Sequence, residues 1–266
     1  MFEFKGRTSA FAWCVISVLA GAQSLSSQSN RTVRAMSVGP FVVQGAIASS
    51  QTSTRYETRT KHDPDGTGRF YMGRETAQVM GPGGIEWLDR SQRDTEEHPA
   101  QVLDALQLHR GEVVADLGAG SGYFTFRMAP KVGETGKVLA VDVQQEMLQA
   151  LRQRAAAMKV TNVQVIRGTE TDPHLPVGAV DLVLMVDVYH ELAYPYEVME
   201  RVRDSLKPKG RVVFVEYRQE DPAVPIKAVH KMSVNQLKKE MNAVGLMHVR
   251  TVETLPLQHI VIFEKQ

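Results

Sequence analysis

From residue 112 to residue 215, apolar runs alternate strictly with segments of helical periodicity. Continuous runs of aliphatic and β-branched residues predict buried strands at 113–117, 138–141, 163–166, 180–186 and 212–215. Helical spacing between these runs predicts helices at 123–128, 145–158 and 195–206. Continuous apolar strands suit a parallel sheet that is covered on both faces. The repeat of strand and helix therefore predicts such a sheet, with right-handed crossovers.

The last part of the chain changes this rhythm. A helix is predicted over 234–244, with Gly245 as its C-terminal stop, and strands are predicted over 246–252 and 259–264. The short turn between these two strands indicates an antiparallel hairpin. The fold class is therefore α/β, with a doubly wound, mainly parallel sheet of seven strands that ends in an antiparallel hairpin.

The N-terminal part predicts three further segments. Lys5 and Arg7 precede a short apolar run that ends in small residues, which is the layout of a signal peptide over 1–22. An uncleaved membrane anchor and an organellar transit peptide are the alternatives. Residues 23–54, rich in Ser, Gln and Thr, predict a flexible tether. Short helical pieces at 75–80 and 85–88 predict a helical cap over 55–98, and a helix at 96–108 leads into a main domain over 99–266.

Composition narrows the classes of function. Basic and acidic residues number 31 and 30, a net charge of +1 that gives no general electrostatic reason to expect a nucleic-acid partner. The single cysteine, Cys14, excludes an internal disulfide and a cysteine-based metal site. The 8 histidines show no ligand spacing, so no metal is expected.

A glycine-rich loop follows the first predicted strand. Its motif residues are Asp116, Gly118, Gly120 and Gly122. A turn without Cβ atoms at a strand end lets the backbone approach a ligand at the carboxyl edge of the sheet. Tyr123 occupies the position where a dinucleotide-binding motif needs a small residue. Asp142 ends the second strand, 20 residues beyond Gly122, and suits the hydroxyls of a ribose.

This combination resembles the class I S-adenosylmethionine-dependent methyltransferases from about residue 97 to the C-terminus. The closest resemblance is to the small-molecule branch that includes quinone-biosynthesis methyltransferases. The family motif (D/E)-x-G-x-G-x-G is matched over 116–122, the acidic residue after the second strand by Asp142, and the L-K-P-G-G turn by 206–210. The resemblance implies a Rossmann-like fold, S-adenosylmethionine as the cofactor and methyl transfer to a small-molecule acceptor.

The resemblance also implies roles for single residues. Asp116 is expected to help position the ammonium of the cofactor, Gly118 and Gly120 to pass its methionine portion, and Asp142 to hold its ribose. Thr169 and Glu170 follow the third main strand, where such enzymes place a polar residue near the adenine. Asp187, at the end of the fourth strand, is either a cofactor ligand or a helix N-cap.

The acceptor side has weaker candidates. His190 lies just beyond the fourth strand and is a candidate general base or substrate-orienting group, with a capping or packing histidine as the alternative. Tyr71 is the second catalytic candidate. With Tyr71, the residues considered for an acceptor pocket are Arg74, Trp87, Arg90 and Arg93. The alternative is that the arginines face solvent and that the tryptophan is a core residue.

Two other functions stay open at this point. A nicotinamide-dependent oxidoreductase is disfavoured by Tyr123, and a non-catalytic cofactor-binding module shares the same sequence features. Location also stays open, because the signal peptide indicates export or a membrane tether, whereas S-adenosylmethionine is made in the cytoplasm. The expected partner is the small-molecule acceptor, and the sequence does not predict an oligomeric state.

Overall fold

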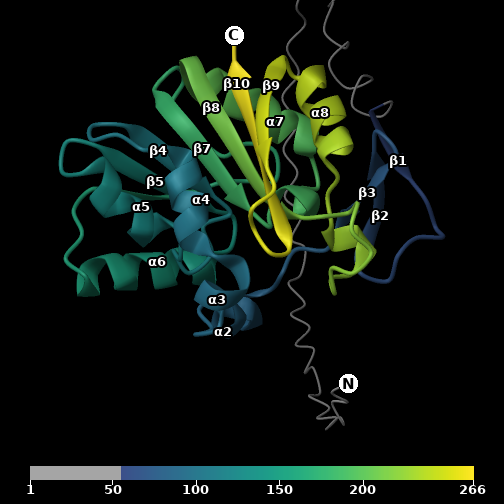
Figure 1. Ribbon diagram of the computed structural model, residues 1–266, viewed down its shortest axis with the longest axis horizontal. Coiled ribbons are helices and arrows are strands. Elements are labelled where there is room, and N and C mark those ends of the chain that lie inside the picture. Colours follow the sequence, from purple (N-terminus) through teal and green to yellow (C-terminus); the bar gives the residue numbers. More distant parts are fainter. Residues whose placement is uncertain (1–54) are drawn as a thin grey trace, which may run out of the picture. The chain divides into compact units, whose positions relative to one another are not determined.

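The computed structural model describes residues 55–266, and its main feature is a seven-stranded sheet (Figure 1). The predicted signal peptide at 1–22 and tether at 23–54 lie outside the described residues. The strand order is β6-β5-β4-β7-β8-β10-β9. The strands are β4 (Val113–Leu117), β5 (Lys137–Asp142), β6 (Val163–Arg167), β7 (Val180–Val186), β8 (Leu206–Tyr217), β9 (Leu246–Val252) and β10 (Gln258–Lys265).

Strand pairing confirms the predicted fold class. The strands from β6 to β8 pair in parallel, and β10 pairs antiparallel with both β8 and β9. Chain order runs outward from β4 in one direction and from β7 in the other, so the strand order reverses between these two strands. Open α/β sheets bind ligands in the crevice at such a point, beyond the carboxyl ends of the strands.

Helices cover both faces of the sheet. They are α4 (Pro99–Leu106), α5 (Thr125–Val132), α6 (Gln145–Ala157), α7 (Pro195–Ser205) and α8 (Val234–Ala243). Alternate residues of β5 divide between the two faces, as the pleat of a strand requires. Val138 and Ala140 belong to the buried clusters that contain α4, α5 and α6, whereas Leu139 belongs to the cluster that contains α7 and α8. None of the described helices has the length and apolar character to cross a bilayer.

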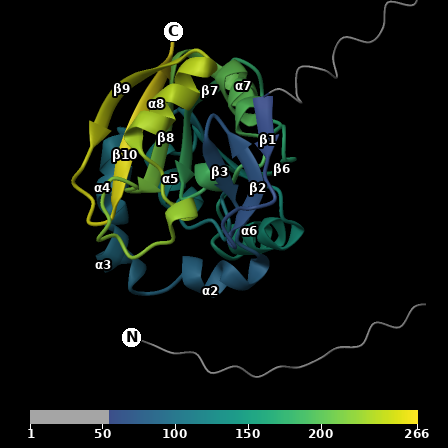
Figure 2. The same cartoon turned by 90° about the vertical axis from the view of Figure 1, so that its right-hand side faces the viewer.

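The segment before the main sheet differs from the predicted helical cap. It begins with a three-stranded antiparallel sheet, which consists of β1 (Tyr56–Thr58), β2 (Gly66–Tyr71) and β3 (Arg74–Ala77). The helix predicted at 75–80 is therefore wrong. Glu75 explains the difference, because its carboxylate accepts hydrogen bonds from the backbone N–H groups of Asp63 and Gly68 and so ties β3 to the preceding turn. Figure 2 looks onto this small sheet.

Short helices connect the small sheet to the main domain. They are the 3₁₀-helix η1 (Pro82–Gly84), α2 (Ile85–Leu88) and α3 (Arg93–Glu97). The single helix predicted at 96–108 is instead divided between α3 and α4. The following Pro99 disfavours the right-handed helical conformation at His98, which ends the first helix there. His98 has a left-handed backbone, φ 49°.

Candidate functional site

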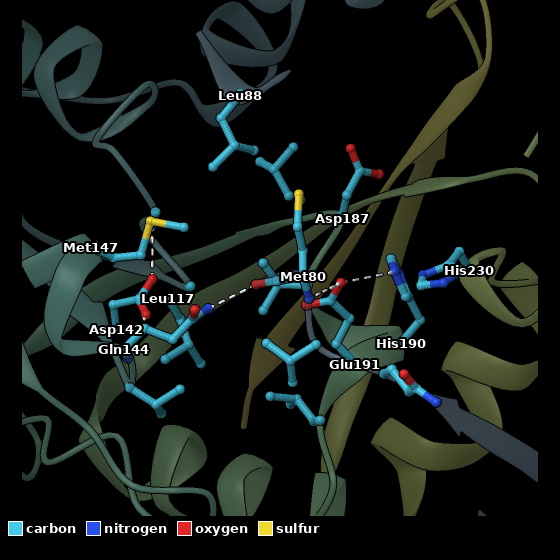
Figure 3. A pocket seen from close by; sticks show the side chains of 18 of the residues that line it. Met80, Leu88, Leu117, Asp142, Gln144, Met147, Asp187, His190, Glu191 and His230 are labelled. Carbon is cyan, nitrogen blue, oxygen red and sulfur yellow. Dashed lines mark hydrogen bonds and ion pairs between the residues drawn. The ribbon is translucent and has the colours of Figure 1, made fainter. Parts of the chain in front are cut away.

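A cavity of about 630 Å³ lies at the carboxyl ends of β4, β5, β6 and β7 (Figure 3). Its position is the crevice that the strand order predicts, and its volume is typical of small-molecule sites, which measure about 300–1,000 Å³. The residues predicted for the site that line it are Gly118, Gly120, Asp142, Thr169, Asp187 and His190. The structure therefore brings residues from four separate strand ends to one cavity.

The glycine loop provides part of the cavity floor through its backbone. Gly118 and Gly120 have φ angles of 73° and 54°. A Cβ at Gly118 would lie 2.5 Å from Cγ2 of Val188, and one at Gly120 would lie 2.8 Å from Cδ1 of Leu88. Both the backbone conformation and the space therefore require glycine. Gly122 is not among the described residues that line the cavity; a Cβ there would lie 2.4 Å from the ring of Phe126, so this glycine permits close helix packing.

Asp142 joins the loop to the end of β5. Its Oδ2 accepts a hydrogen bond of 2.9 Å from the backbone N–H of Gly120, and its Oδ1 accepts one of 2.9 Å from that of Gln144. Burial raises the pKa of Asp142 above its usual value, although these N–H groups act in the opposite direction. Each carboxylate oxygen keeps acceptor capacity toward the cavity, so the side chain is able to hold ligand hydroxyls.

Asp116 lies behind the loop rather than in the main cavity. It lines a side cavity of about 30 Å³ that also contacts Gly118 and Gly120. Its Oδ2 accepts a hydrogen bond of 2.5 Å from Oγ1 of Thr125. Burial raises the pKa of this carboxyl to about 6. Asp116 therefore supports the loop and reaches a ligand only through this side cavity.

Of the two residues predicted near the adenine, the structure brings one to the cavity. Thr169 lines it, and its hydroxyl oxygen accepts a hydrogen bond of 3.0 Å from the backbone N–H of Asp172. Glu170 is exposed and is not among the lining residues of the described chain. Thr169 therefore stays a candidate for contact with the adenine, whereas the side chain of Glu170 does not face the cavity.

Asp187 presents an unsatisfied carboxylate oxygen. Its Oδ2 accepts a hydrogen bond of 2.7 Å from Nε2 of Gln258, whereas its buried Oδ1 has no hydrogen-bond partner among residues 55–266. Burial, followed by the negative charges of Glu216 and Glu97, raises its pKa to about 8. Buried polar groups are nearly always paired, so Oδ1 is suited to accept a hydrogen bond from a donor group of a bound ligand. The N-cap alternative is wrong, because the N-cap position of the next helix is Val188 and no side chain makes a capping hydrogen bond there.

His190 lies in the 3₁₀-helix η2 (Tyr189–Glu191) with its side chain buried. Its Nδ1 is 2.6 Å from Oε2 of Glu216 on β8, and Oε1 of Glu216 accepts a 2.9 Å hydrogen bond from the backbone N–H of Tyr189. Because a carboxylate only accepts, Nδ1 is the donor, and in the neutral ring Nε2 carries the lone pair. Burial lowers the pKa of His190, but the negative charge of Glu216 outweighs it and the pKa is raised above 6.5.

Tyr71 and Arg74 are not among the described residues that line the cavity. The buried ring of Tyr71 packs 5.4 Å from that of Tyr56, and its hydroxyl has no hydrogen-bond partner in the described part of the chain. Arg74 makes two hydrogen bonds to the buried Glu240, of 2.9 and 3.0 Å, and a third of 3.3 Å to the carbonyl of His190. Arg74 therefore supports η2 rather than contacting an acceptor.

Trp87, Arg90 and Arg93 all line the cavity. Trp87 is 53 % exposed, so the expectation of a core tryptophan is wrong. Both arginines form ion pairs with Glu97, at 2.7 Å for Arg90 and 2.8 Å for Arg93. Arg90 also pairs with Glu96 at 2.8 Å, so two carboxylates compensate the two arginine charges.

Several residues that line the cavity were not predicted from the sequence. Gln144 Nε2 donates a hydrogen bond of 2.9 Å to the carbonyl of Met80, whose N–H donates one of 3.3 Å to Oε1 of Glu191. His230, in the 3₁₀-helix η3 (Ala228–His230), completes the far end. Figure 3 shows Asp142 and Gln144 on one side of Met80, with His190, Glu191 and His230 on the other. Of these residues, only Gln144 lies close enough to a sequence motif to have been predicted, because it follows Asp142 by two residues.

A family model described as a methyltransferase domain matches residues 108–259. The chain belongs to this family. A solved S-adenosylmethionine-dependent methyltransferase from Aquifex aeolicus has 26 % sequence identity and a TM-score of 0.67, and the match covers 71 % of this chain and 100 % of that one. The fold, the glycine loop and these matches assign the chain to the class I S-adenosylmethionine-dependent methyltransferases. The oxidoreductase and the non-catalytic module gain no support from them.

Two curated relatives match a shorter stretch. The ubiquinone/menaquinone biosynthesis C-methyltransferase UbiE of Escherichia fergusonii is 27 % identical over 117 residues, which are 44 % of this chain and 47 % of the relative. A tRNA U34 carboxymethyltransferase of Desulfotalea psychrophila is 29 % identical over 131 residues, which are 48 % and 38 % of the two chains. The chain thus spans less than half the length of these relatives.

The cofactor of the family is S-adenosylmethionine, and the cavity fits it at three points. The loop backbone at Gly118 and Gly120 lines the cavity, so a ligand is able to contact it there. Asp142 offers a buried carboxylate at the strand end where the family has its acidic residue. Asp187 offers its buried Oδ1, which has no hydrogen-bond partner in the described chain and is able to accept a hydrogen bond from the cofactor.

Proposed function

We propose that the chain transfers a methyl group from S-adenosylmethionine to a small-molecule acceptor bound beside η2 and η3. The observation that carries this proposal is a single cavity that is lined by the glycine loop and Asp142 and also by His190 and Glu191. Methyl transfer requires the acceptor atom and the donor to be aligned in one site that excludes water. A cavity that holds both ends of that reaction meets the requirement.

The cofactor end is proposed to work mainly through the backbone. Asp142 accepts hydrogen bonds from ribose hydroxyls, Gly118 and Gly120 pass the methionine portion, and Asp116 helps to orient the ammonium from the side cavity. Thr169 lies at the strand end proposed to contact the adenine. When bound, the cofactor supplies an electrophilic methyl group on a sulfonium. The protein contributes position and exclusion of water, because displacement at such a carbon needs few catalytic groups.

His190 is proposed to act at the acceptor end. Its Nε2 carries a lone pair on a ring whose orientation Glu216 fixes from the opposite side. A positioned imidazole removes a proton from a hydroxyl or amine near neutral pH and contributes about 10²–10⁴-fold to rate in such a role. His190 therefore serves as the general base, or orients an acceptor that needs none.

The acceptor is proposed to be a small aromatic molecule related to quinone precursors. The similarity to the ubiquinone/menaquinone biosynthesis C-methyltransferase supports this class, and the similarity to the tRNA carboxymethyltransferase supports a nucleic acid instead. The charge pattern favours the small molecule. Arg90 and Arg93 in the cavity wall are paired with Glu97 rather than free for phosphates, and the net charge of the chain is only +1.

Replacement of Asp142 tests the cofactor end. Asp142→Ala is expected to weaken the binding of S-adenosylhomocysteine by about 1.5–3 kcal/mol, the scale of a hydrogen bond to a charged group. Isothermal titration calorimetry measures this change. Glu170→Ala is the matched control, because Glu170 is also acidic and follows a strand but does not line the cavity, and its affinity should be unchanged. Equal affinity in both variants would remove Asp142 from the site.

Turnover tests the reaction itself. The protein is incubated with S-adenosylmethionine and a panel of phenols, quinols and tRNA, and formation of S-adenosylhomocysteine is followed by mass spectrometry. Turnover with a phenol or quinol is the expected result. Turnover with tRNA alone would overturn the small-molecule acceptor while keeping the cofactor assignment.

A further inference from the structure

Three side chains with metal-binding atoms meet at the acceptor end of the cavity. They are His190 and Glu191 on η2 and His230 on η3, and one ligand atom from each lies within 4.8 Å of the others. Nε2 of His190 is 4.0 Å from Oε1 of Glu191, and the rings of the two histidines are 5.2 Å apart between centroids. All three residues line the main cavity (Figure 3). The chain separation of His230 from the other two hides this cluster from any sequence pattern.

His190 also has the supporting contact that metal-bound histidines usually have. The ring nitrogen of such a histidine that does not bind the metal nearly always donates to a carboxylate or a carbonyl. Nδ1 of His190 makes this contact with the fully buried Glu216 at 2.6 Å. Glu216 is itself held by the backbone N–H of Tyr189, and Arg74 holds the carbonyl of His190. The Nε2 lone pair is therefore presented in one orientation.

The donor set indicates the class of ion. Two imidazole nitrogens and one carboxylate oxygen suit divalent ions such as Zn²⁺, Co²⁺, Mn²⁺ and Fe²⁺, whereas Mg²⁺ and Ca²⁺ prefer oxygen ligands throughout. Ligand distances of about 2.0–2.2 Å place the ligand atoms of one ion no more than about 4.4 Å apart. The ligand atoms lie within 4.8 Å of one another, slightly farther apart than this limit, and Glu191 and His230 are both only partly buried.

We propose that His190, Glu191 and His230 bind one divalent transition-metal ion in the wall of the cavity. Three protein ligands leave open coordination positions, the arrangement found in catalytic rather than structural metal sites. Because all three residues line the cavity, the open positions face the acceptor space. The open coordination positions would bind a methyl acceptor with two neighbouring oxygens, such as a catechol or a hydroxyquinol.

Binding of the ion does not depend on the proposed function, but its use in methyl transfer does. An ion bound to a hydroxyl lowers the pKa of that hydroxyl and fixes its position. Nε2 of His190 would then be a ligand and unable to accept a proton. The ion would take over the task assigned above to His190 as a base.

Titration with Co²⁺ tests the site directly. The full chain is stripped of metal with a chelator and then titrated with Co²⁺ while its visible absorption is recorded. We expect one saturable site per chain. His230→Gln should weaken Co²⁺ binding by at least about tenfold, because it removes a ligand, and Glu216→Gln by about 10–100-fold, the usual effect of losing an outer partner.

A matched histidine variant controls for weak surface binding. His248 lies on β9, 3.0 Å from Oγ1 of Thr251, and is not among the described residues lining the cavity. His248→Gln should leave Co²⁺ affinity unchanged. Absence of a saturable site, or the same affinity in the His230 and His248 variants, would overturn the metal site. If His230→Gln fails to fold, Glu191→Gln replaces it under the same criterion.

Binding of S-adenosylhomocysteine separates this proposal from the proposed function. The His230 variant should keep that affinity within about threefold, since His230 is remote from the cofactor end. A chain that binds S-adenosylhomocysteine but no Co²⁺ would refute the metal site alone. A chain that binds Co²⁺ but no S-adenosylhomocysteine would refute the proposed function alone.

Discussion

The two ends of the cavity are built by different kinds of contact. At the proposed cofactor end, the backbone N–H of Gly120 donates a hydrogen bond to the carboxylate of Asp142, which is 22 residues away in the chain. At the acceptor end, His190 depends on Glu216 and on Arg74, which is 116 residues away in the chain, and Arg74 depends in turn on Glu240. The first end is set by consecutive strand ends, and the second by buried charges from distant segments. Substitutions should therefore affect the two ends independently.

The largest effect is expected from removing the buried carboxylate behind the acceptor end. Glu240 is fully buried and pairs with Arg74, and it accepts a 2.6 Å hydrogen bond from the hydroxyl of Tyr189. Glu240→Ala leaves the Arg74 charge buried without its partner, which typically costs about 3–5 kcal/mol. Urea denaturation should show this loss in the free energy of unfolding.

An exposed ion pair provides the control for that variant. Glu253 pairs with Arg218 at 2.8 Å, and its side chain is 54 % exposed. Glu253→Ala should cost less than about 1 kcal/mol, because solvent screens such a pair. A loss of similar size in both variants would show that the Arg74–Glu240 pair does not govern the stability of the acceptor end.

His190→Gln separates the two ends by function. The variant should lower turnover by roughly 10²-fold or more, because both roles considered for His190 need the imidazole. Affinity for S-adenosylhomocysteine should stay within about threefold, because the contacts of Gly120 and Asp142 do not involve η2. Steady-state kinetics and calorimetry on one preparation measure both quantities. A parallel fall in both would mean that the ends are coupled and that His190 belongs to the scaffold.

The same contrast explains what the sequence could and could not predict. The parallel strands, the terminal hairpin and the cavity-lining positions of Gly118, Gly120 and Asp142 follow from local patterns, because the period of a strand and a glycine turn both depend on consecutive residues. The antiparallel sheet at 56–77 was missed because Glu75 stabilises it through backbone groups of a preceding turn. His230 was missed because only tertiary packing brings η3 to η2.

Asp187 predicts a pH dependence of stability. Its folded pKa of about 8 exceeds the usual 3.8, so the folded chain holds a proton that the unfolded chain releases. The stabilisation is fully present below pH 3.8 and is lost as the pH rises toward 8. Asp187→Asn resembles the protonated form and keeps the acceptor for Gln258. Between pH 5 and pH 8.5 without ligand, its stability should rise relative to the native chain by up to about 4 kcal/mol.

Denaturation at a series of pH values measures this difference, with Asp172→Asn as the control. Asp172 is only partly buried and lies beyond the neighbouring strand β6, so its replacement should not reproduce the rise expected for Asp187→Asn. A constant difference between Asp187→Asn and the native chain from pH 5 to pH 8.5 would mean that the carboxylate of Asp187 is ionised throughout that range.

The smallest effect is expected at Tyr71, which is a buried polar residue like Tyr189 but has a different hydrogen-bond environment. The hydroxyl of Tyr71 has no partner in the described chain, and burial raises its pKa to about 12, so it holds its proton at neutral pH. Tyr71→Phe breaks no hydrogen bond and should change stability by less than about 1 kcal/mol and turnover by less than about twofold. Tyr189→Phe is the control, because it loses a hydrogen bond to a charged carboxylate and should cost about 1.5–3 kcal/mol. Unfolding and initial-rate measurements compare the two variants. A tenfold fall in turnover for Tyr71→Phe at unchanged stability would mean that the Tyr71 hydroxyl takes part in the reaction and that the acceptor site extends to β2.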